Sequence, residues 1–396
     1  MSSLDSHSLH HETWPPFQPP WWLKSAHAQT LAAAFWPARL DAHRAIALRV
    51  ELSEGDAVVV HDDCPDGWSN DGRVALLAHG LGGCHRSPLL VRLAAKLNAR
   101  GVRVFRWDMR GCGAGLGMAG RPYHAGCSDD LRRVIESVLG WCSTSSDVAT
   151  TSTCFTPDRV AGVESSSPQR LAATHLLGTA KAPTPATQAE IVSACRLSLF
   201  GVSLSGNILL KYLGESPALV PSQVVQAIAV NPPIDLAASV RTLSGRINRM
   251  YDRHFVGSLT RHLADRQRLR PDAPMPDMTK LPRTLFEFDD WYTAPMSGFP
   301  DAPTYYAKCS AAQFVPQIKT PTTIITSCND PMVPVEMFSP ECIVYPESVR
   351  LHIANGGGHV GYIARSGLDP DVHWLDWRVV DLITAGEADL RKQIGL

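Results

Sequence analysis

Short apolar runs alternate with amphipathic segments along most of the chain. Val74 to Ala78 is a continuous apolar run, Leu89 to Ala99 has apolar residues at helical spacing, and Val102 to Trp107 is a second apolar run. A strand, a helix and a strand in this order predict a βαβ unit. The alternation continues with predicted helices at 130–139 and 208–213 and predicted strands at 197–202, 225–230, 322–327 and 349–353. We therefore expect a mainly parallel sheet with helices on both faces.

Two further strands are expected ahead of this unit. Ile46 to Leu52 and Ala57 to His61 are rich in aliphatic residues, and Ser53-Glu54-Gly55 between them is a turn-like sequence. This spacing predicts an antiparallel pair at the start of the domain.

Three segments depart from the alternation. Residues 1–45 form a Pro/aromatic arm, and its portion from Trp14 to Trp22 is not expected to be helical, because proline lacks a donor and restricts its neighbour. We expect this arm to lie along the domain surface. Residues 143–188 are rich in Ser, Thr, Ala and Pro, which predicts a disordered insertion. Residues 234–315 have helical patterns that predict a cap above the strand ends. The core then comprises 46–142, 189–233 and 316–396.

Composition and charge narrow the classes of protein. Apolar residues make up 44% and charged residues 19% of 396 residues, and the formal net charge is −1. This balance provides no basic field for nucleic acid. No run reaches the ~20 apolar residues that span a bilayer, so we expect a soluble, cytoplasmic protein, with peripheral membrane contact left open.

Ten cysteines without a C-x-x-C pair predict free, mostly buried thiols.

The segment Gly201-Val202-Ser203-Leu204-Ser205-Gly206 lies where a predicted strand ends and a helix begins. In this context a G-x-S-x-G turn exposes a serine hydroxyl, so Ser203 is the candidate nucleophile. Ser205 stands where glycine is expected, and serine is small enough for such a turn.

A serine nucleophile requires a histidine base and an acid that orients it. The chain order Ser, acid, His places the acid after a late strand. Asp330 follows the predicted strand 322–327, and His359 lies in a glycine-rich loop after the strand 349–353, which we expect to be flexible. Asp289 and Asp290 also precede His359, but they fall in the cap, where no strand fixes their direction. We therefore choose Asp330.

An oxyanion hole requires two backbone N–H groups. One belongs to the residue after the nucleophile, which is Leu204, and the other to the loop after an early strand. His79-Gly80-Leu81-Gly82-Gly83 is that loop, and we assign the second donor to Leu81.

At these motifs the chain resembles the YheT-like branch of the α/β-hydrolases, which includes bacterial esterases and membrane-anchored eukaryotic lipases. The matches run in order through most of the chain, at Pro19-Pro20-Trp21-Trp22, His27-x-Gln29-Thr30, His79-Gly80-Leu81-x-Gly83, Arg110-Gly111-Cys112-Gly113, Tyr123-His124-x-Gly126, Gly201-x-Ser203-Leu204-x-Gly206-Asn207, Glu287-Phe288-Asp289-Asp290, Tyr305-Tyr306-x-x-Cys309-Ser310, Asp330-Pro331 and Gly357-Gly358-His359-x-Gly361.

The resemblance implies an α/β-hydrolase fold with a triad of Ser203, Asp330 and His359 and with no metal or organic cofactor. It also implies hydrolysis of carboxylic esters with apolar acyl chains, so the expected partner is a small-molecule ester or a lipid. The chain departs from the family at Ser205 and in the 143–188 insertion. We interpret other matched segments, such as Arg110 and 287–290, as structural.

Other interpretations are weaker. Gly115-Leu116-Gly117-Met118-Ala119-Gly120 fits the G-x-G-x-x-G pattern of dinucleotide-binding proteins. However, it neither follows its strand directly nor opens a helix, so we reject it. An acyltransferase that uses the same triad, and a non-catalytic binding protein with the same fold, remain open alternatives.

Overall fold

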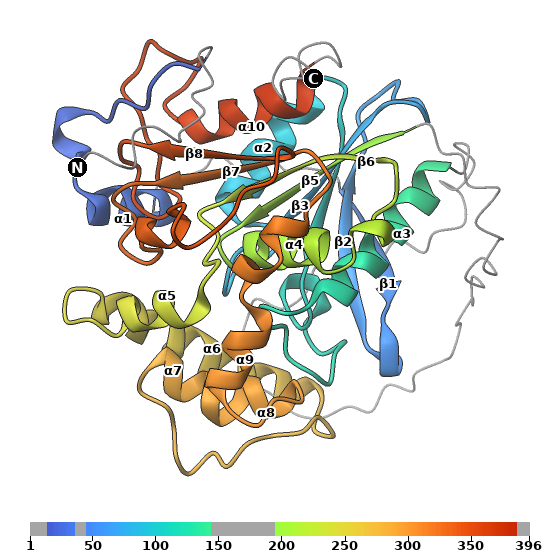
Figure 1. Ribbon diagram of the computed structural model, residues 1–396. Helices are drawn as coiled ribbons and strands as arrows, with labels where there is room; N and C mark the ends of the chain where they lie inside the picture. Colours follow the sequence, from blue (N-terminus) through green and yellow to red (C-terminus); the bar gives the residue numbers. More distant parts are fainter. Residues whose placement is uncertain (1–13, 36–44, 144–194, 386–396) are drawn as a thin grey trace, which may run out of the picture.

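A computed structural model of the protein describes residues 14–35, 45–143 and 195–385 (Figure 1). One sheet of eight strands lies at its centre, in the order β1-β2-β4-β3-β5-β6-β7-β8. The strands are β1 (Ile46–Glu51), β2 (Ala57–Asp63), β3 (Arg73–Ala78), β4 (Arg103–Asp108), β5 (Arg196–Val202), β6 (Val224–Val230), β7 (Thr322–Ser327) and β8 (Val349–Ala354). β1 pairs with β2 and β2 with β4 in antiparallel fashion, and all other pairs are parallel. Every predicted strand is confirmed to within two residues at each end.

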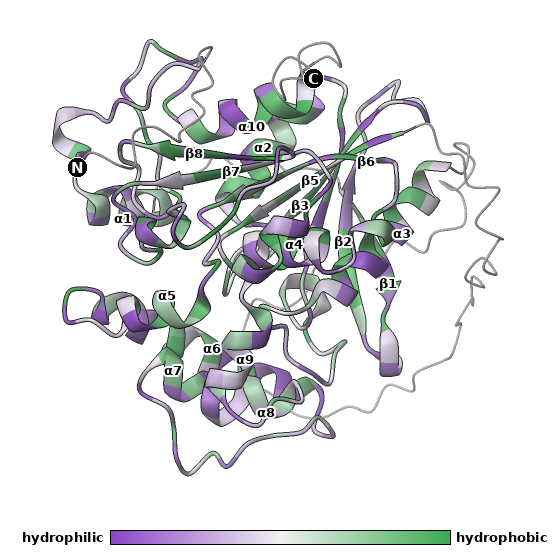
Figure 2. Cartoon of the chain, in the orientation of Figure 1, coloured by the Kyte–Doolittle hydropathy of each residue, from purple (hydrophilic) through white to green (hydrophobic). Residues whose placement is uncertain are grey.

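Helices cover both faces of the sheet, as predicted. On one face lie α2 (Pro88–Asn98) and α10 (Trp374–Thr384), which contact each other, and on the other lie α3 (Ser128–Ser143) and α4 (Leu204–Glu215). The alternation of side chains along the strands explains why both faces are apolar. In β5, Leu197 and Leu199 join one buried cluster, whereas Phe200 and Val202 join the other. The central strands are accordingly hydrophobic along their length (Figure 2).

The chain between β6 and β7 is helical and lies beside the sheet as a separate layer (Figure 1). We call residues 234–315 the cap. Its helices are α5 (Leu236–Leu243), α6 (Arg249–Leu269), α7 (Leu285–Phe288), the π-helical turn η6 (Asp289–Thr293), α8 (Ala294–Met296) and α9 (Ala302–Cys309). No helix among the described residues, α6 included, combines the length and apolar character needed to cross a membrane.

The N-terminal arm agrees with the prediction only in part. Trp21–Leu23 forms one 3-10 turn, and α1 (Ala26–Phe35) is helical. Pro20 is the N-cap of the short turn, a position that requires no helical hydrogen bond from it. The arm also reaches the interior, because Phe17 is only 2% exposed and packs edge-on against Tyr362 and Trp374. The expectation that 14–22 is not helical therefore fails only at Trp21 and Trp22, which belong to the 3-10 turn. The expected surface position holds for these two exposed tryptophans but not for Phe17.

Two further sequence predictions concern the insertion at 143–188 and the cysteines. Apart from Ser143, the last residue of α3, the predicted disordered insertion at 143–188 lies outside the described residues. Nine cysteines fall within the described residues, and all nine are free. Five of them are buried, namely Cys112, Cys127, Cys142, Cys195 and Cys309.

Candidate active site

Four sequence-predicted site segments meet at one edge of the sheet. Ser203 follows β5 directly, Asp330 follows β7, His359 follows β8, and Leu81 follows β3. These four strands are parallel, so their carboxyl ends share an edge, which is where ligands bind in open α/β sheets. The cap lies over this edge.

Ser203 occupies a strained turn between β5 and α4. Its backbone has φ +54° and ψ −122°, a conformation that is unusual for a residue with a side chain. The turn is so tight that a Cβ at Gly201 would lie 2.5 Å from the carbonyl oxygen of Ser205. Backbone strain of this kind is typical of a serine presented at the end of a strand.

Ser205 ties this turn to the neighbouring strand. The Val202 N–H donates to Ser205 Oγ at 2.8 Å, and that hydroxyl lies 2.9 Å from the carbonyl oxygen of Ala78, at the end of β3. The hydroxyl is buried, so it links β5 and β3 beneath the turn. The serine in place of glycine is thus a bonded part of the turn rather than a tolerated irregularity.

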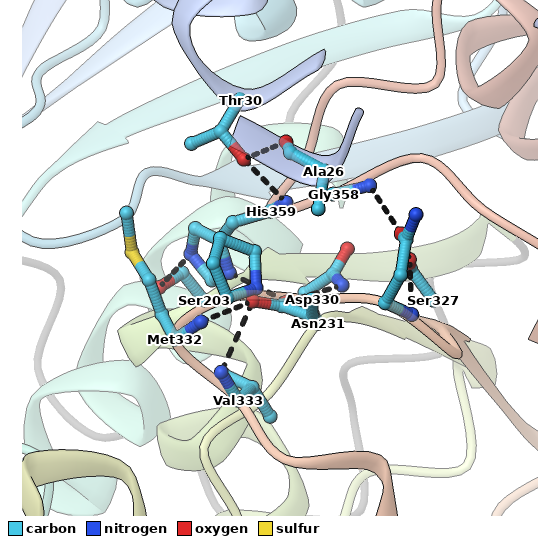
Figure 3. A network of polar contacts seen from close by, with 12 residues as sticks. Ala26, Thr30, Ser203, Asn231, Ser327, Asp330, Met332, Val333, Gly358 and His359 are labelled. Carbon is cyan, nitrogen blue, oxygen red and sulfur yellow. Dashed lines mark hydrogen bonds and ion pairs between the residues drawn. The ribbon is translucent and has the colours of Figure 1, made fainter. Parts of the chain in front are cut away.

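The structure brings the predicted serine, histidine and aspartate together (Figure 3). His359 Nε2 lies 3.0 Å from Ser203 Oγ, and His359 Nδ1 lies 2.8 Å from Asp330 Oδ2. Because an ionised carboxylate only accepts, Nδ1 carries the hydrogen that faces Asp330. Nε2 then has a free lone pair with which to accept the hydrogen of the serine hydroxyl.

Asp330 is held from several directions. Its Oδ1 accepts hydrogen bonds from the N–H groups of Met332 and Val333, at 2.8 and 3.0 Å. Its Oδ2 accepts a further bond from the side-chain amide of Asn231, at 2.7 Å, in addition to that from His359. The carboxylate is buried, so these donors replace water around its charge. Sequence reasoning did not identify Asn231, because no motif contains it.

The glycine loop that carries His359, which we expected to be flexible, is held by hydrogen bonds to neighbouring side chains. The His359 N–H donates to Thr30 Oγ1 at 2.9 Å, and the Gly358 N–H donates to Asn329 Oδ1 at 3.0 Å. A Cβ at Gly358 would lie 2.3 Å from the carbonyl oxygen of Ala26 in α1. The glycine therefore permits close contact with α1 (Figure 3). Thr30 was present in a matched motif, but nothing in the sequence linked it to His359.

The two predicted oxyanion donors have free N–H groups. Within the part of the chain that the structure describes, neither Leu81 N nor Leu204 N donates to a protein acceptor. Leu204 is the first residue of α4, where backbone N–H groups have no partner inside the helix. A Cβ at Gly80 would lie 3.2 Å from Ser203 Cβ, so the loop carrying Leu81 passes close to the serine.

Asp108, at the end of β4, holds the segment that follows this loop through hydrogen bonds to His85. Its Oδ1 accepts from the His85 N–H at 2.6 Å, and its Oδ2 accepts from His85 Nδ1 at 2.7 Å and from His61 Nε2 at 3.0 Å. Burial favours the neutral acid, but the hydrogen bonds from both imidazoles hold the pKa of Asp108 well below its ordinary value. These three side chains are also the one group of metal-ligand type among the described residues. Their mutual hydrogen bonds account for their arrangement.

A pocket joins the sheet edge to the cap. Its walls include Ser203, Leu81, Leu204 and His359 from the sheet edge. The cap side has an apolar part formed by Leu236, Val240, Leu243, Phe255, Leu259, Leu263, Leu285 and Phe288, and polar residues that include His262, Arg266 and Asp289. The apolar part suits an extended apolar group.

The rival acids Asp289 and Asp290, and Arg110 from a matched segment, have different surroundings. Asp290 Oδ1 accepts from the Ala302 N–H at the start of α9, so it stabilises the cap itself. Arg110 is paired with Asp56 and Asp130, in agreement with a structural role. Asp289 instead lines the pocket and accepts a hydrogen bond from Tyr306.

Sequence comparison finds a matching protein family and related proteins. The sequence profile described as "Alpha/beta hydrolase family" matches residues 75–370. The chain is 27% identical over 340 residues to "Putative esterase YheT" of Escherichia coli, an alignment that covers 85% of this chain and 84% of that protein. It is 30% identical over 179 residues to the monoacylglycerol lipase of Saccharomyces cerevisiae, which covers 43% of this chain and 39% of that protein.

Among solved structures, the fold is similar to that of the alpha/beta hydrolase GrgF from Penicillium. The TM-score is 0.47 at 17% sequence identity, with 89% of this chain and 99% of that chain covered.

Proposed function

The chain belongs to the alpha/beta hydrolase family, and from that premise we propose that it hydrolyses carboxylic esters with apolar acyl chains through an acyl-enzyme on Ser203. Its curated relatives include proteins named as an esterase and as a monoacylglycerol lipase, which support an ester substrate. The observation that carries the proposal is the continuous hydrogen-bonded chain from Ser203 through His359 to Asp330, which opens into a mostly apolar pocket.

In the first half of the reaction, Ser203 Oγ attacks the ester carbonyl carbon while His359 Nε2 takes the hydroxyl proton. The carbonyl oxygen becomes an oxyanion, which the free N–H groups of Leu81 and Leu204 stabilise. The tetrahedral intermediate then collapses as the C–O bond to the alcohol breaks. The imidazolium gives its proton to the departing alkoxide, and the acyl group remains on Ser203.

In the second half, a water molecule replaces the alcohol. His359 takes one proton from the water as its oxygen attacks the acyl carbon. The intermediate collapses with transfer of the proton to Ser203 Oγ, so the free acid leaves and the enzyme is restored. Throughout both halves, Asp330 orients the imidazole and stabilises its charged form without being protonated itself.

The proposal is tested with a panel of p-nitrophenyl esters from acetate to palmitate. We expect hydrolysis with a maximum at an acyl chain longer than acetate, because the apolar cap side of the pocket gains contacts with each methylene. Ser203→Ala should abolish it, whereas Ser258→Ala, a matched control on the neighbouring helix α6, should not. Absence of hydrolysis across the whole panel would contradict the proposal.

The same assay separates hydrolysis from acyl transfer when an alcohol is added. In the presence of ethanol we expect free acid to remain the main product. Predominant formation of the ethyl ester at low ethanol concentration would reassign the protein as an acyltransferase, since the acyl-enzyme is common to both reactions.

A further inference from the structure

One carboxyl group, that of Asp289, lines the cap side of the pocket, which also includes the cationic side chain of Arg266. Asp289 lies in the π-helical turn η6, lines the same pocket as Ser203, and is 8% exposed. Its Oδ2 accepts a hydrogen bond from the Tyr306 hydroxyl at 2.8 Å. In the described part of the chain, no arginine, lysine or histidine forms an ion pair with it. Among the described residues, Asp289 therefore has no counter-charge in direct contact.

Other acids of the cap have structural tasks that Asp289 lacks. Asp252 accepts from the Leu285 N–H at 2.7 Å, Asp290 accepts from the Ala302 N–H at 2.9 Å, and Asp301 caps α9 through the Thr304 N–H. Each of these carboxylates satisfies a backbone donor at the start of a helix. Asp289 bonds to side chains only, so no backbone group requires it.

Burial without a counter-charge is costly for a carboxyl group. It raises the pKa of Asp289 to about 6, although hydrogen bonds from Thr293 and Tyr306 act in the opposite direction. Asp289 accepts hydrogen bonds within the cap, but it has no counter-charge in contact and lines the pocket that holds Ser203. A perturbed acid in such a pocket is a candidate for a ligand-binding role.

A hydrogen-bond donor lines the same pocket. The Gly126 N–H donates to His124 Nδ1 at 3.1 Å, so the ring hydrogen resides on Nε2, which has no acceptor among the described residues. Burial lowers the pKa of His124 to about 4, and the ring is therefore neutral at pH 7. The Tyr305 ring packs near both His124 and Tyr306. Its centroid lies 5.9 Å from that of His124 and 5.2 Å from that of Tyr306.

We propose that Asp289 and Tyr306, in the pocket that His124 also lines, form a subsite that binds a hydroxyl group of the ester substrate. A hydroxyl group can give its hydrogen to Asp289, and its oxygen can accept one. A carboxylate would be repelled by Asp289, and an ammonium group would be repelled by Arg266, which lines the same pocket. This inference rests on the proposed esterase function.

The hydroxyl group could belong to the alcohol part or to the acyl part of the ester, and two pairs of isosteric substrates distinguish these sources. The first pair is 2-hydroxyethyl octanoate and propyl octanoate. The second pair is ethyl 8-hydroxyoctanoate and ethyl nonanoate. In each pair a hydroxyl group replaces a methyl group of similar size. We expect the wild type to prefer the hydroxyl member in at least one pair by about 10- to 100-fold in kcat/KM, as for a hydrogen bond to a charged group.

Asp289→Leu should reduce this preference to about one. Tyr306→Phe should reduce it partly, because the carboxyl group loses the bond that orients it. Asp290→Asn is the matched control and should keep the wild-type preference. Hydrolysis of the methyl members reports on the esterase function, so failure of that function is distinguishable from failure of the subsite.

A binding measurement makes the subsite testable without turnover. Calorimetric titration of both pairs into Ser203→Ala should give a lower Kd for the hydroxyl member, and this difference should disappear in Ser203→Ala/Asp289→Leu. If that double variant does not fold, Ser203→Ala/Tyr306→Phe takes its place. Equal Kd values within both pairs for Ser203→Ala, or an unchanged preference after removal of the Asp289 carboxyl group, would overturn the proposal.

Discussion

The two walls of the pocket hold their polar groups in different ways. On the sheet edge, Asp330 has four hydrogen-bond donors and His359 is fixed through both ring nitrogens and its backbone. On the cap side, most side chains are apolar and Asp289 bonds to side chains alone. The ends of parallel strands fix the directions of the polar side chains that follow them. Helices packed through apolar contacts mainly determine the shape of the pocket. Substitutions at the sheet edge should therefore affect all esters equally, and substitutions in the cap should alter the ranking of esters.

The largest loss is expected for Ser203→Ala. Without the oxygen that forms the acyl-enzyme, kcat should fall by about 10⁴- to 10⁶-fold for every ester in the panel, with an unchanged circular dichroism spectrum. Loss for some esters and not for others would show that the sheet edge also selects substrates, and the distinction between the two walls would fail.

Asp330→Asn should lower kcat by about 10⁴-fold, because the imidazole loses the acceptor that fixes its tautomer. Asp290→Asn is the control in the cap, since an asparagine oxygen can still accept from the Ala302 N–H. That variant should stay within about threefold of the wild type, the spread usual for a neutral surface or scaffold change. A collapse of activity in Asp290→Asn, with Asp330→Asn active, would assign the acid to the cap instead.

Asp108→Ala tests whether the loop that carries Leu81 must be held rigidly. Loss of the bonds to His85 should lower kcat by about 10- to 100-fold with little change in KM, because the oxyanion donors act in the transition state. Asp62→Asn removes another buried acid, which pairs with Arg103 rather than with this loop, and should leave kcat nearly unchanged. Steady-state kinetics on both variants test this prediction. A change in KM without a change in kcat would contradict the view that Asp108 holds the loop that carries Leu81.

In the cap, Leu259→Trp should change the ranking of esters. The larger ring fills part of the apolar wall, so kcat/KM for the longest esters should fall by about tenfold while acetate and butyrate esters are unaffected. A uniform loss across the panel would indicate that α6 helps to fix the reacting groups.

The smallest effect concerns stability. Because burial raises the pKa of Asp289 to about 6, from an ordinary value of 3.8, the folded protein binds a proton more tightly than the unfolded chain. Its stability should therefore fall as pH rises from about 4 to above 6, by at most about 3 kcal/mol. The stability of the Asp289→Asn variant should not show this fall with rising pH. Urea unfolding should show the variant gaining stability over the wild type between pH 4.5 and pH 8, and a constant difference would contradict the burial of an uncompensated carboxyl group.

Sequence patterns predicted the sheet edge better than the cap for a physical reason. Strand ends are located by continuous apolar runs, and parallel topology brings those ends together, so Ser203, Asp330 and His359 could be grouped from their positions in the chain. Thr30 and Asn231 could not, since each acts through a contact that only the folded chain creates. Asp289 and Asp290 were indistinguishable because a π-helical turn determines which of them lines the pocket, and its spacing is not apparent in the residues.

The most direct test of the proposed mechanism is covalent labelling of the wild-type protein with a fluorophosphonate, followed by intact-mass measurement and peptide mapping. The reagent reacts with a serine whose hydroxyl is activated by a base. We predict one adduct per chain, located on Ser203, formed much more slowly in His359→Ala and absent in Ser203→Ala. An adduct on another residue, or a protein that remains unlabelled while its fold is intact, would contradict the account.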